Sequence, residues 1–338
     1  MLELPLFCSF IITFLLTPLI KLLAERFEIF DNPNGRKIHN KPIPLLGGVG
    51  IFIGFIVCLI FFLYRDFKIY LIFVTSILVL LMGLLDDIKN LKVLWKVIVE
   101  ALVAILLISS GIKLEVGSLI THNTLLAFII DGLITLIWIV GIINATNFID
   151  GLDSLCINIV FWPVIGFLFL GFMEGNEVIA YISLSLIGSI LGFFPYNIYP
   201  ARIFMGDAGS TFLGFILSIL SILNFQQLKN PLAISIPILF LGIPIFDMLF
   251  VICKRIKIKK SIFVADNNHF HHRLKAIGLD HYSILFYMNS LSIIALLVGI
   301  IIYLTRTYTS GMIIVALLTI FILYRCSKSR EEKCNDNQ

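Results

Sequence analysis

Five short polar segments interrupt an otherwise apolar chain, and they carry the kinds of side chain that bind cations and phosphates. The segments are DNPNGRKIHNKPIP (Asp31 to Pro44), DDIKN (Asp86 to Asn90), NATNFIDGLD (Asn144 to Asp153), RIFMGDAGS (Arg202 to Ser210) and DNNHFHHRL (Asp266 to Leu274). Carboxylate and amide oxygens suit a hard cation, whereas guanidinium and imidazole groups suit a phosphate. Together they predict one site that is distributed over several loops.

Asp86 and Asp87 end an apolar segment and are predicted to be catalytic. Neighbouring residues of a helix point about 100° apart, so the two carboxylates are expected to differ in role, one on a metal and one on a nucleophile's proton. The alternative is an acidic pair that merely ends a helix at the membrane interface. A helix C-terminus disfavours negative charge, which weakens this alternative.

Asn144, Asn147, Asp150 and Asp153 recur at every third position. On a helix this spacing predicts a polar stripe that winds slowly around one side until Gly151 loosens it. Amides and carboxylates together suit a nucleobase or ribose and a hard cation. Asp150 is predicted to be catalytic, and the other three are predicted to bind substrate. The alternative, a capped helix end, requires one such residue rather than four.

Asp207 lies in FMGDAGST just before an apolar run, where the free amides of a helix N-terminus favour an anionic side chain. It is predicted to be a metal ligand, and simple N-capping by Asp207 or Ser210 is the alternative. A presenilin-like protease would have glycine at the position of Phe204, so that match fails. Phe204 instead offers a surface on which a base could stack.

The segment HxHHR contains His269, His271, His272 and Arg273. Zinc is one alternative, but no cysteine and no helix-spaced histidine pair accompanies these residues. Three imidazoles and a guanidinium suit an anionic diphosphate better, so all four residues are predicted to bind substrate. The nearby lysine run, Lys254 to Lys260, is expected to meet acidic headgroups.

A second, looser group of cationic residues lies in the polar segment Asp31 to Pro44. Its members, predicted to bind phosphate or only to orient the chain in the membrane, are Arg36, Lys37, His39 and Lys41.

The elements that must position these residues are membrane helices. The 338 residues are 59% hydrophobic and 14% charged, with a mean hydropathy of +1.03, which leaves too few charges to cover a soluble surface. A net charge of +4 that is spread along the chain gives a nucleic-acid partner no support. Apolar runs of about 17 to 22 residues predict eleven spans in an all-α fold. They are Leu4 to Leu23, Leu45 to Leu63, Tyr70 to Leu85, Leu94 to Ser110, Leu125 to Ile143, Cys156 to Met173, Val178 to Pro195, Ser210 to Phe225, Leu232 to Ile252, Ile284 to Leu304 and Ser310 to Tyr324.

The distribution of basic residues orients these spans. Most of the 25 Lys and Arg residues fall in the loops that carry the polar segments. The positive-inside rule therefore places those loops and the C-terminus inside the cell, and the N-terminus outside. On the opposite face the longest link is Gly111 to Thr124, where KLEVGSL is expected to form a small strand pair. Residues 1–325 are predicted to form a single integral-membrane domain, followed by a polar cytoplasmic tail over residues 326–338.

These motifs resemble those of the polyprenyl-phosphate N-acetylhexosamine-1-phosphate transferases, a branch of the glycosyltransferase 4 family. The resemblance covers DNPNGRKIH, PLLGG, GLLDD, NATNFIDGLD, ARIFMGDAGSTFLG and NNHFHHRLKAIG, in this order. The HxHHR form is similar to the WecA and TagO branch. Two departures are Ser154, where the family often has glycine, and Glu100, where glutamine is common.

The resemblance implies an Mg²⁺-dependent enzyme of the cytoplasmic membrane, in which Mn²⁺ can replace Mg²⁺. It would transfer sugar 1-phosphate, expected to be GlcNAc 1-phosphate, from a UDP-N-acetylhexosamine to undecaprenyl phosphate and release UMP. The product would begin a cell-envelope polysaccharide such as teichoic acid or O-antigen. One of Asp86 and Asp87 would act as base or nucleophile, and Asp207 and Asp87 would hold the metal. Whether the enzyme is a homodimer stays open.

Two other functions are compatible with parts of the sequence. A cation-coupled transporter would account for the intramembrane acids Asp131 and Asp247, although transporters usually have paired repeats with sites at mid-membrane. A non-catalytic lipid-binding scaffold would show no turnover. Release of UMP from a UDP-sugar separates the enzyme from both alternatives.

Overall fold

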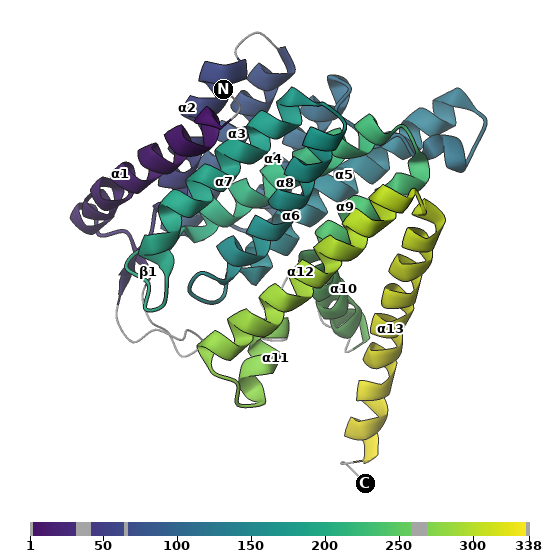
Figure 1. Cartoon of the computed structure of the whole chain (residues 1–338). Helices are drawn as coiled ribbons and strands as arrows, with labels where there is room; N and C mark the ends of the chain where they lie inside the picture. The colour runs from purple at the N-terminus through teal and green to yellow at the C-terminus, as the bar shows by residue number, and fades with distance from the viewer. Residues whose placement is uncertain (1–2, 32–41, 64–66, 258–268, 336–338) are drawn as a thin grey trace. The chain divides into compact units, whose positions relative to one another are not determined.

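Helices make up most of the chain in the computed structural model, which describes residues 3–31, 42–63, 67–257 and 269–335 (Figure 1). They are α1 (Leu4–Arg26), α2 (Gly47–Leu63), α3 (Phe67–Lys89), α4 (Val93–Ser109), α5 (Thr124–Ile149), α6 (Leu155–Met173), α7 (Glu177–Asn197), α8 (Gly206–Leu228), α9 (Ser235–Phe240), α10 (Gly242–Lys257), α11 (Phe270–Ala276), α12 (His281–Thr305) and α13 (Tyr308–Asn335). Two-residue strands, β1 (Phe30–Asp31) and β2 (Ile43–Pro44), pair antiparallel. The expected all-α membrane architecture is confirmed.

Within the described residues, seven helices are long and apolar enough to cross a membrane, or eight if a bent pair forms one span. Two shorter apolar helices cover Gly47–Phe62 and Tyr308–Leu323. Each predicted span coincides with a helix or, for the ninth, with a bent pair. The count of eleven crossings stays a prediction.

The ninth predicted span is not one straight helix. Helix α9 ends at Phe240, and α10 begins at Gly242 after a bend of 86°. Pro244 lies in the first turn of α10, where proline is tolerated because its missing N–H would have no helical partner. The sequence LGIPIF therefore ends one helix and starts another, which apolarity alone did not predict.

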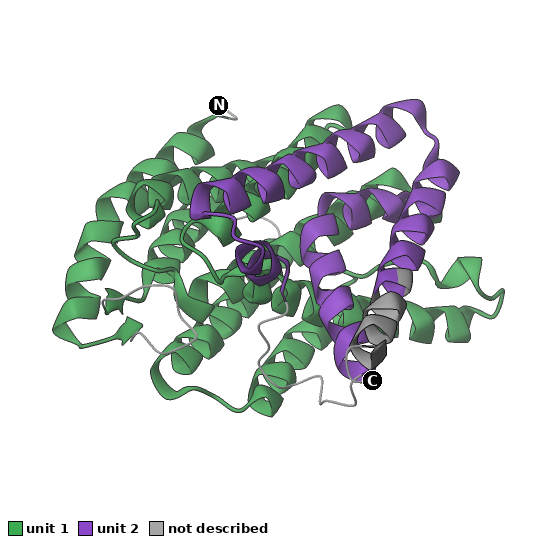
Figure 2. Cartoon of the chain, turned by 90° about the horizontal axis from the view of Figure 1, so that it is seen from below, with its two compact units in different colours: residues 1–231 green, residues 232–338 purple. Residues whose placement is uncertain are grey.

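The chain divides into two compact units, Met1–Pro231 and Leu232–Gln338 (Figure 2). In the first unit, α8 packs against α2, α3, α5, α6 and α7. In the second, α12 packs against α9, α10, α11 and α13. The prediction of one membrane domain over residues 1–325 with a tail over residues 326–338 stays a prediction.

Helix α8 is the buried centre of the first unit, because nearly every side chain between Gly206 and Phe225 is buried. Small residues allow its backbone to approach its neighbours closely, as is usual between membrane helices. Gly83 of α3 shows the need for them, since a Cβ atom there would collide with the backbone of Asp207 and Ala208. This approach brings the C-terminal end of α3 to the amino end of α8.

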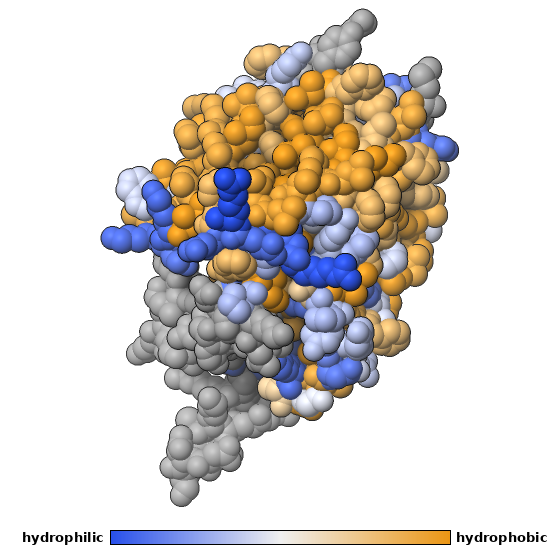
Figure 3. Space-filling model, turned by 90° about the vertical axis from the view of Figure 1, so that its left-hand side faces the viewer, coloured by the Kyte–Doolittle hydropathy of each residue, from blue (hydrophilic) through white to orange (hydrophobic). Residues whose placement is uncertain are grey.

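The outer surface of α1 is apolar, with Phe7, Leu15 and Leu22 more than half exposed. Figure 3, which views the left-hand side of Figure 1, shows a broad hydrophobic field with hydrophilic side chains along its lower border. Such a surface suits the hydrocarbon core of a bilayer, since isolated soluble proteins rarely expose apolar patches of this kind.

The segment between α4 and α5 does not contain the expected strand pair. Its described residues include a 3-10 turn, η1 (Gly117–Leu119), instead of strands. The backbone N–H of Gly117 donates to Asp131 Oδ1 at 2.6 Å, and the N–H of Leu114 donates to Thr135 Oγ1 at 2.9 Å. Because α5 side chains take these donors, the segment lies along a helix rather than pairing with itself.

Asp131 therefore has partners in the segment between α4 and α5. Besides Gly117, its Oδ2 lies 3.6 Å from Lys113 Nζ, and both side chains are mostly buried. Asp131, one of the two acids that suggested a transporter, thus fixes the segment between α4 and α5 to α5.

Asp131→Leu is expected to lower the free energy of unfolding by about 3 kcal/mol, because it leaves Lys113 and the Gly117 N–H unpaired. Thermal unfolding in detergent measures this change. Glu115→Gln, at an exposed carboxylate of the same segment, is the control and should unfold like wild type. Equal unfolding temperatures for the two variants would contradict the structural role of Asp131.

Candidate active site at the amino end of helix α8

The polar residues of the first unit converge where α8 begins. Asp207 is in the first turn of α8, directly after Gly206, whose φ of 71° lies in the left-handed region. A side chain at position 206 would be strained by this φ and would also meet the carboxylate of Asp87. Gly206 thus permits both the turn into α8 and the approach of α3.

Asp87 uses its carboxylate at this helix terminus. Its Oδ1 accepts the N–H of Asp207 at 2.7 Å, and its Oδ2 accepts the N–H of Ala208 at 3.1 Å. The first N–H groups of a helix have no partner within the helix, and they carry partial positive charge. A carboxylate from the end of α3 therefore caps α8 and fixes the position of Asp207.

Asp86 points to a different partner, as the 100° separation of neighbouring helical residues predicts. Its Oδ1 accepts the N–H of Leu91 at 2.7 Å, and its Oδ2 accepts from Lys96 Nζ at 2.5 Å. Lys96 Nζ also donates to Asp207 Oδ2 at 3.2 Å. One ammonium group of α4 thereby bridges the carboxylates of α3 and α8.

The side chains of Asp86 and Lys96 are 9% and 15% exposed, whereas that of Asp207 is 39% exposed. Among these three, Asp207 is the group that a ligand can reach. We name Asp86, Asp87, Lys96 and Asp207 the carboxylate–lysine cluster.

Two asparagines of α5 connect this cluster to its surroundings. Asn147 Nδ2 donates to Asp207 Oδ1 and to Ser210 Oγ, both at 3.0 Å. Asn144, one turn earlier, donates instead to Glu100 Oε2 at 2.6 Å. Asn147 thus contacts the cluster directly, and Asn144 contacts α4.

The predicted stripe ends earlier than expected, because α5 stops at Ile149 and Asp150 is its C-cap. Burial raises the pKa of the Asp150 carboxyl well above its usual range, and the charges of Asp207 and Asp87 raise it further. Asp153 Oδ2 accepts the N–H of Ala201 at 2.8 Å, so it ties this connection to the segment before α8. Ser154 has a φ of 58°, a conformation in which glycine is favoured.

Lys96 and Glu100 were not predicted from the sequence as site residues. They lie within the apolar run Leu94 to Ser110, whose length and hydropathy predict a membrane span. The signal was present, since charged residues inside a predicted span are costly and usually face a polar interior. Their spacing of four also places them on one face of α4, toward the carboxylates.

The donor atoms of the cluster fit Mg²⁺. Among the described residues no group of three or more His, Cys, Asp or Glu side chains is arranged as a metal site. Mg²⁺ does not require one, because it is usually bound through one or two carboxylates, with water and substrate phosphates as its other ligands. Asp207 and Asp87 offer hard oxygen atoms at a helix terminus, and the Asp207 side chain is partly exposed.

The other predicted substrate-binding residues have separate positions. Phe204 precedes α8; its N–H donates to the carbonyl of Pro44 in β2, and its carbonyl accepts the N–H of Gly47 at the start of α2. The loop residues Arg36, Lys37, His39 and Lys41 lie outside the described part of the chain.

The histidines belong to the second unit. His269 is the N-cap of α11, and its Nδ1 lies 2.9 Å from Asp247 Oδ2. The N–H of Phe270 donates to Asp247 Oδ1 at 2.7 Å. Asp247, the other acid that suggested a transporter, therefore anchors α11 to α10.

His271 is 1% exposed, and neither of its ring nitrogens has a hydrogen-bond partner among the described residues. Burial lowers its pKa to about 3, and the neighbouring His272 and His269 lower it further. The centroids of the His271 and His272 rings are 4.2 Å apart. His271 is consequently a neutral imidazole at pH 7.

Replacing His271 should weaken the pH dependence of stability. The unfolded chain binds a proton at this histidine below about pH 6.5, whereas the folded chain does so only near pH 3. Between these values wild type therefore loses stability as the pH falls, by up to about 1.4 kcal/mol per pH unit. Unfolding temperatures at pH 7 and pH 5 should differ less in His271→Leu than in wild type. The exposed His122→Leu should behave as wild type; an unchanged pH dependence in His271→Leu would exclude this role.

Comparison with known proteins agrees with this geometry. The model of glycosyl transferase family 4 matches residues 69–224, which include the whole carboxylate–lysine cluster. A Bacillus subtilis (strain 168) protein named probable undecaprenyl-phosphate N-acetylglucosaminyl 1-phosphate transferase is 40% identical over 279 residues, covering 81% of this chain and 77% of the relative.

Two further relatives are named undecaprenyl-phosphate alpha-N-acetylglucosaminyl 1-phosphate transferase. The one from Thermotoga maritima is 34% identical over 262 residues, or 78% of each chain. The one from Haemophilus influenzae is 31% identical over 310 residues, or 88% of this chain and 86% of the relative. The resemblance seen in these ordered motifs is confirmed, and the chain belongs to glycosyl transferase family 4.

Proposed function

We propose that this chain transfers N-acetylglucosamine 1-phosphate from UDP-N-acetylglucosamine to undecaprenyl phosphate and releases UMP. An oxygen of the lipid phosphate would attack the sugar-bearing phosphorus as the bond to UMP breaks. The product would begin a cell-envelope polysaccharide such as teichoic acid or O-antigen. The relatives are named for this transfer. The observation that carries the proposal is the carboxylate–lysine cluster inside the segment that the family model matches.

Phosphoryl transfer requires mainly positioning and charge neutralisation. Lys96 Nζ, within reach of Asp207 and Asp86, would neutralise charge on the phosphates. Asp207 and Asp87 would hold Mg²⁺, which when bound supplies Lewis-acid stabilisation of phosphoryl oxygens. Because both oxygens of Asp87 already accept N–H groups of α8, its geometry supports a positioning role rather than nucleophilic attack.

Asp150 is the candidate for proton transfer. Burial and the neighbouring charges raise the pKa of Asp150, so it holds a proton more readily than an ordinary aspartate, which favours a role in proton transfer. Its position at the end of α5, within the electrostatic influence of Asp207, supports this role. Asp86 is the second candidate, although Lys96 and Leu91 already occupy its oxygens.

The loops that carry the site are proposed to face the cytoplasm, where a water-soluble UDP-sugar would be available. The excess of Lys and Arg in these loops supports this orientation, and the same count of spans places the histidine segment on this side. No observation favours the transporter, since Asp131 and Asp247 both hold local structure.

A cysteine at position 90, in a variant without other cysteines, should be protected from an impermeant thiol reagent in intact cells. It should react in inside-out vesicles, because Asn90 is exposed at the end of α3 beside the carboxylate–lysine cluster. A cysteine in place of the exposed His122 should show the opposite behaviour. Labelling of position 90 in intact cells would contradict the proposed orientation.

The function is tested by mixing purified chain with undecaprenyl phosphate, Mg²⁺ and a panel of UDP-sugars, and measuring UMP and the lipid product. UMP release that depends on the lipid, and is fastest with UDP-N-acetylglucosamine, is the expected result. Chelation of Mg²⁺ should stop it. No UMP release by folded protein would refute the enzyme and leave the scaffold.

A further inference from the structure

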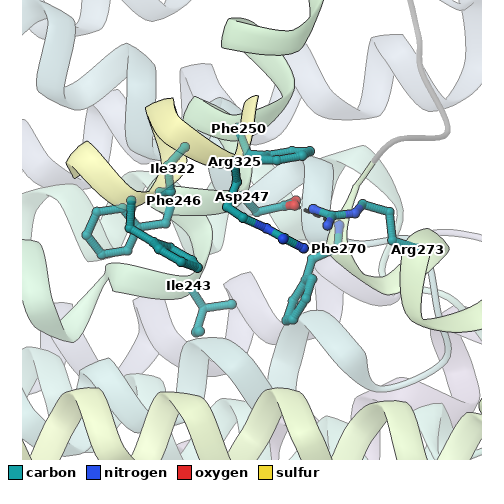
Figure 4. A pocket seen from close by; sticks show the side chains of 9 residues that line it. Ile243, Phe246, Asp247, Phe250, Phe270, Arg273, Ile322 and Arg325 are labelled. Atoms are coloured by element: carbon teal, nitrogen blue, oxygen red, sulfur yellow. Dashed lines mark hydrogen bonds between the residues drawn. The ribbon is translucent and has the colours of Figure 1, made fainter. Parts of the chain in front are cut away.

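The second unit contains a pocket of about 320 Å³ that lies between α10, α11 and α13 (Figure 4). Its size is within the range of small-molecule sites. Most of its lining is apolar, but two arginines and one aspartate also reach it. The lining residues are Ile243, Phe246, Asp247, Phe250, Phe270, Arg273, Phe321, Ile322 and Arg325.

The two arginines converge from different helices. Arg273 comes from α11 and Arg325 from α13, and Figure 4 shows their guanidinium groups pointing toward each other beside Asp247. The guanidinium carbon of Arg273 lies 4.2 Å from the centroid of the Phe250 ring, which holds it over the aromatic wall.

Asp247 cannot balance both charges. Its two oxygens accept from the Phe270 N–H and lie against His269, which fixes the start of α11. Among the described residues that line the pocket, one carboxylate beside two guanidinium groups leaves an excess of positive charge at one end. The last turn of α10 adds the basic residues Lys254, Arg255 and Lys257.

The arginines lie at the depth where lipid headgroups are expected. The apolar stretch of α13 ends at Leu323, and Arg325 follows two residues later. Basic side chains at such a boundary reach the headgroup region while their stems stay in the apolar layer. Phe246 and Phe250 of α10 and Phe321 of α13, in contrast, belong to helices with apolar stretches.

We propose that this pocket binds an anionic phospholipid of the surrounding bilayer. The phosphate lies between Arg273 and Arg325, and part of an acyl chain lies against Phe246, Phe250 and Phe270. A guanidinium pair suits the phosphate because it can donate several charge-assisted hydrogen bonds. A bilayer phospholipid, rather than a rarer carrier lipid, is the occupant, since occupancy follows concentration and the pocket offers no unengaged carboxylate for chemistry.

Native mass spectrometry of the full chain in neutral detergent tests this proposal, with phosphatidylglycerol and phosphatidylcholine of equal acyl chains as probes. Wild type should bind phosphatidylglycerol at least about tenfold more tightly, which corresponds to about 1.4 kcal/mol. Arg325→Gln should remove this preference. Arg26→Gln, at an exposed arginine in the last turn of α1, is the matched control and should retain it.

A second variant tests the apolar part without changing charge. Ile322→Trp should fill the pocket and lower phosphatidylglycerol binding about tenfold, although both arginines remain. A photoactivatable phosphatidylglycerol should crosslink to α10 and α13 in wild type and lose these crosslinks in Ile322→Trp. Size-exclusion chromatography establishes that each variant is folded.

Three outcomes would overturn the proposal. Equal binding of the two phospholipids would exclude recognition of the headgroup. An equal loss of the preference for phosphatidylglycerol in Arg325→Gln and Arg26→Gln would exclude this pocket as the binding site. Complete displacement of phosphatidylglycerol by an equal concentration of undecaprenyl phosphate would assign the pocket to the carrier lipid instead.

Discussion

Asp207→Asn is expected to lower the rate of UMP release by a thousandfold or more at saturating Mg²⁺. The amide keeps the size of the side chain but removes the charge that binds a hard cation. It also keeps only one of the two acceptor oxygens that receive Lys96 and Asn147. Each tenfold loss corresponds to about 1.4 kcal/mol of barrier, and loss of metal-based charge stabilisation costs several kcal/mol. Of the two carboxylates that Lys96 connects, Asp207 is the more exposed, so it is the more accessible to a ligand.

Asp280→Asn is the matched control, because Asp280 also lies at a helix N-terminus and accepts the N–H of Ser283 at 3.3 Å. A helix cap contributes about 1 kcal/mol to stability and does not take part in the chemistry. UMP release should therefore stay near that of wild type in this variant. Activity of folded, monodisperse Asp207→Asn within about threefold of wild type would assign Asp207 a structural role. Asp86, Asp87 and Asp150 would then have to account for the metal.

Lys96→Met should reduce UMP release by about a hundredfold or more. Loss of a preorganised electrostatic group from an active site typically costs two to three orders of magnitude. Lys96 has the geometry of such a group, since its ammonium lies between carboxylates of two helices. Lys96→Arg keeps the positive charge on a side chain of different shape. Its rate of UMP release should lie between those of Lys96→Met and wild type.

Lys21→Met is the control for removing a lysine from a membrane helix, because the partner of Lys21 among the described residues is Glu25 of the same helix, at 3.5 Å. It should have nearly normal activity. A double-mutant cycle with Asp86→Asn separates structure from catalysis: unfolding temperatures should reveal coupling between positions 96 and 86. Normal UMP release by folded Lys96→Met would remove Lys96 from the site.

The apolar runs by themselves determined the main elements of the fold. A run of about 20 apolar residues can satisfy its backbone inside a bilayer only as a helix, so length and hydropathy predict these helices without any tertiary information. The ninth span differs because Gly242 and Pro244 allow a bend that hydropathy does not register. The prediction of a strand pair in KLEVGSL was wrong because N–H groups of this segment donate to Asp131 and Thr135 of α5 instead of to a second strand.

The sequence also identified the polar side chains that gather at α8, because carboxylates and amides in an apolar chain are costly without a purpose. Residue type and spacing predicted Asp86, Asp87, Asn147 and Asp207 as neighbours. They could not distinguish Asn147, which contacts Asp207, from Asn144, which contacts Glu100. That difference depends on which face of α5 packs on α8.

Only the tertiary structure decided the partners within the cluster. The approach of Gly83 to α8 brings Asp87 to the first N–H groups of that helix, and the packing of α4 brings Lys96 between two carboxylates. These contacts join residues up to 121 positions apart. Local sequence determines helices because their hydrogen bonds are local, whereas the geometry of a site that spans four helices is determined by how their side chains pack.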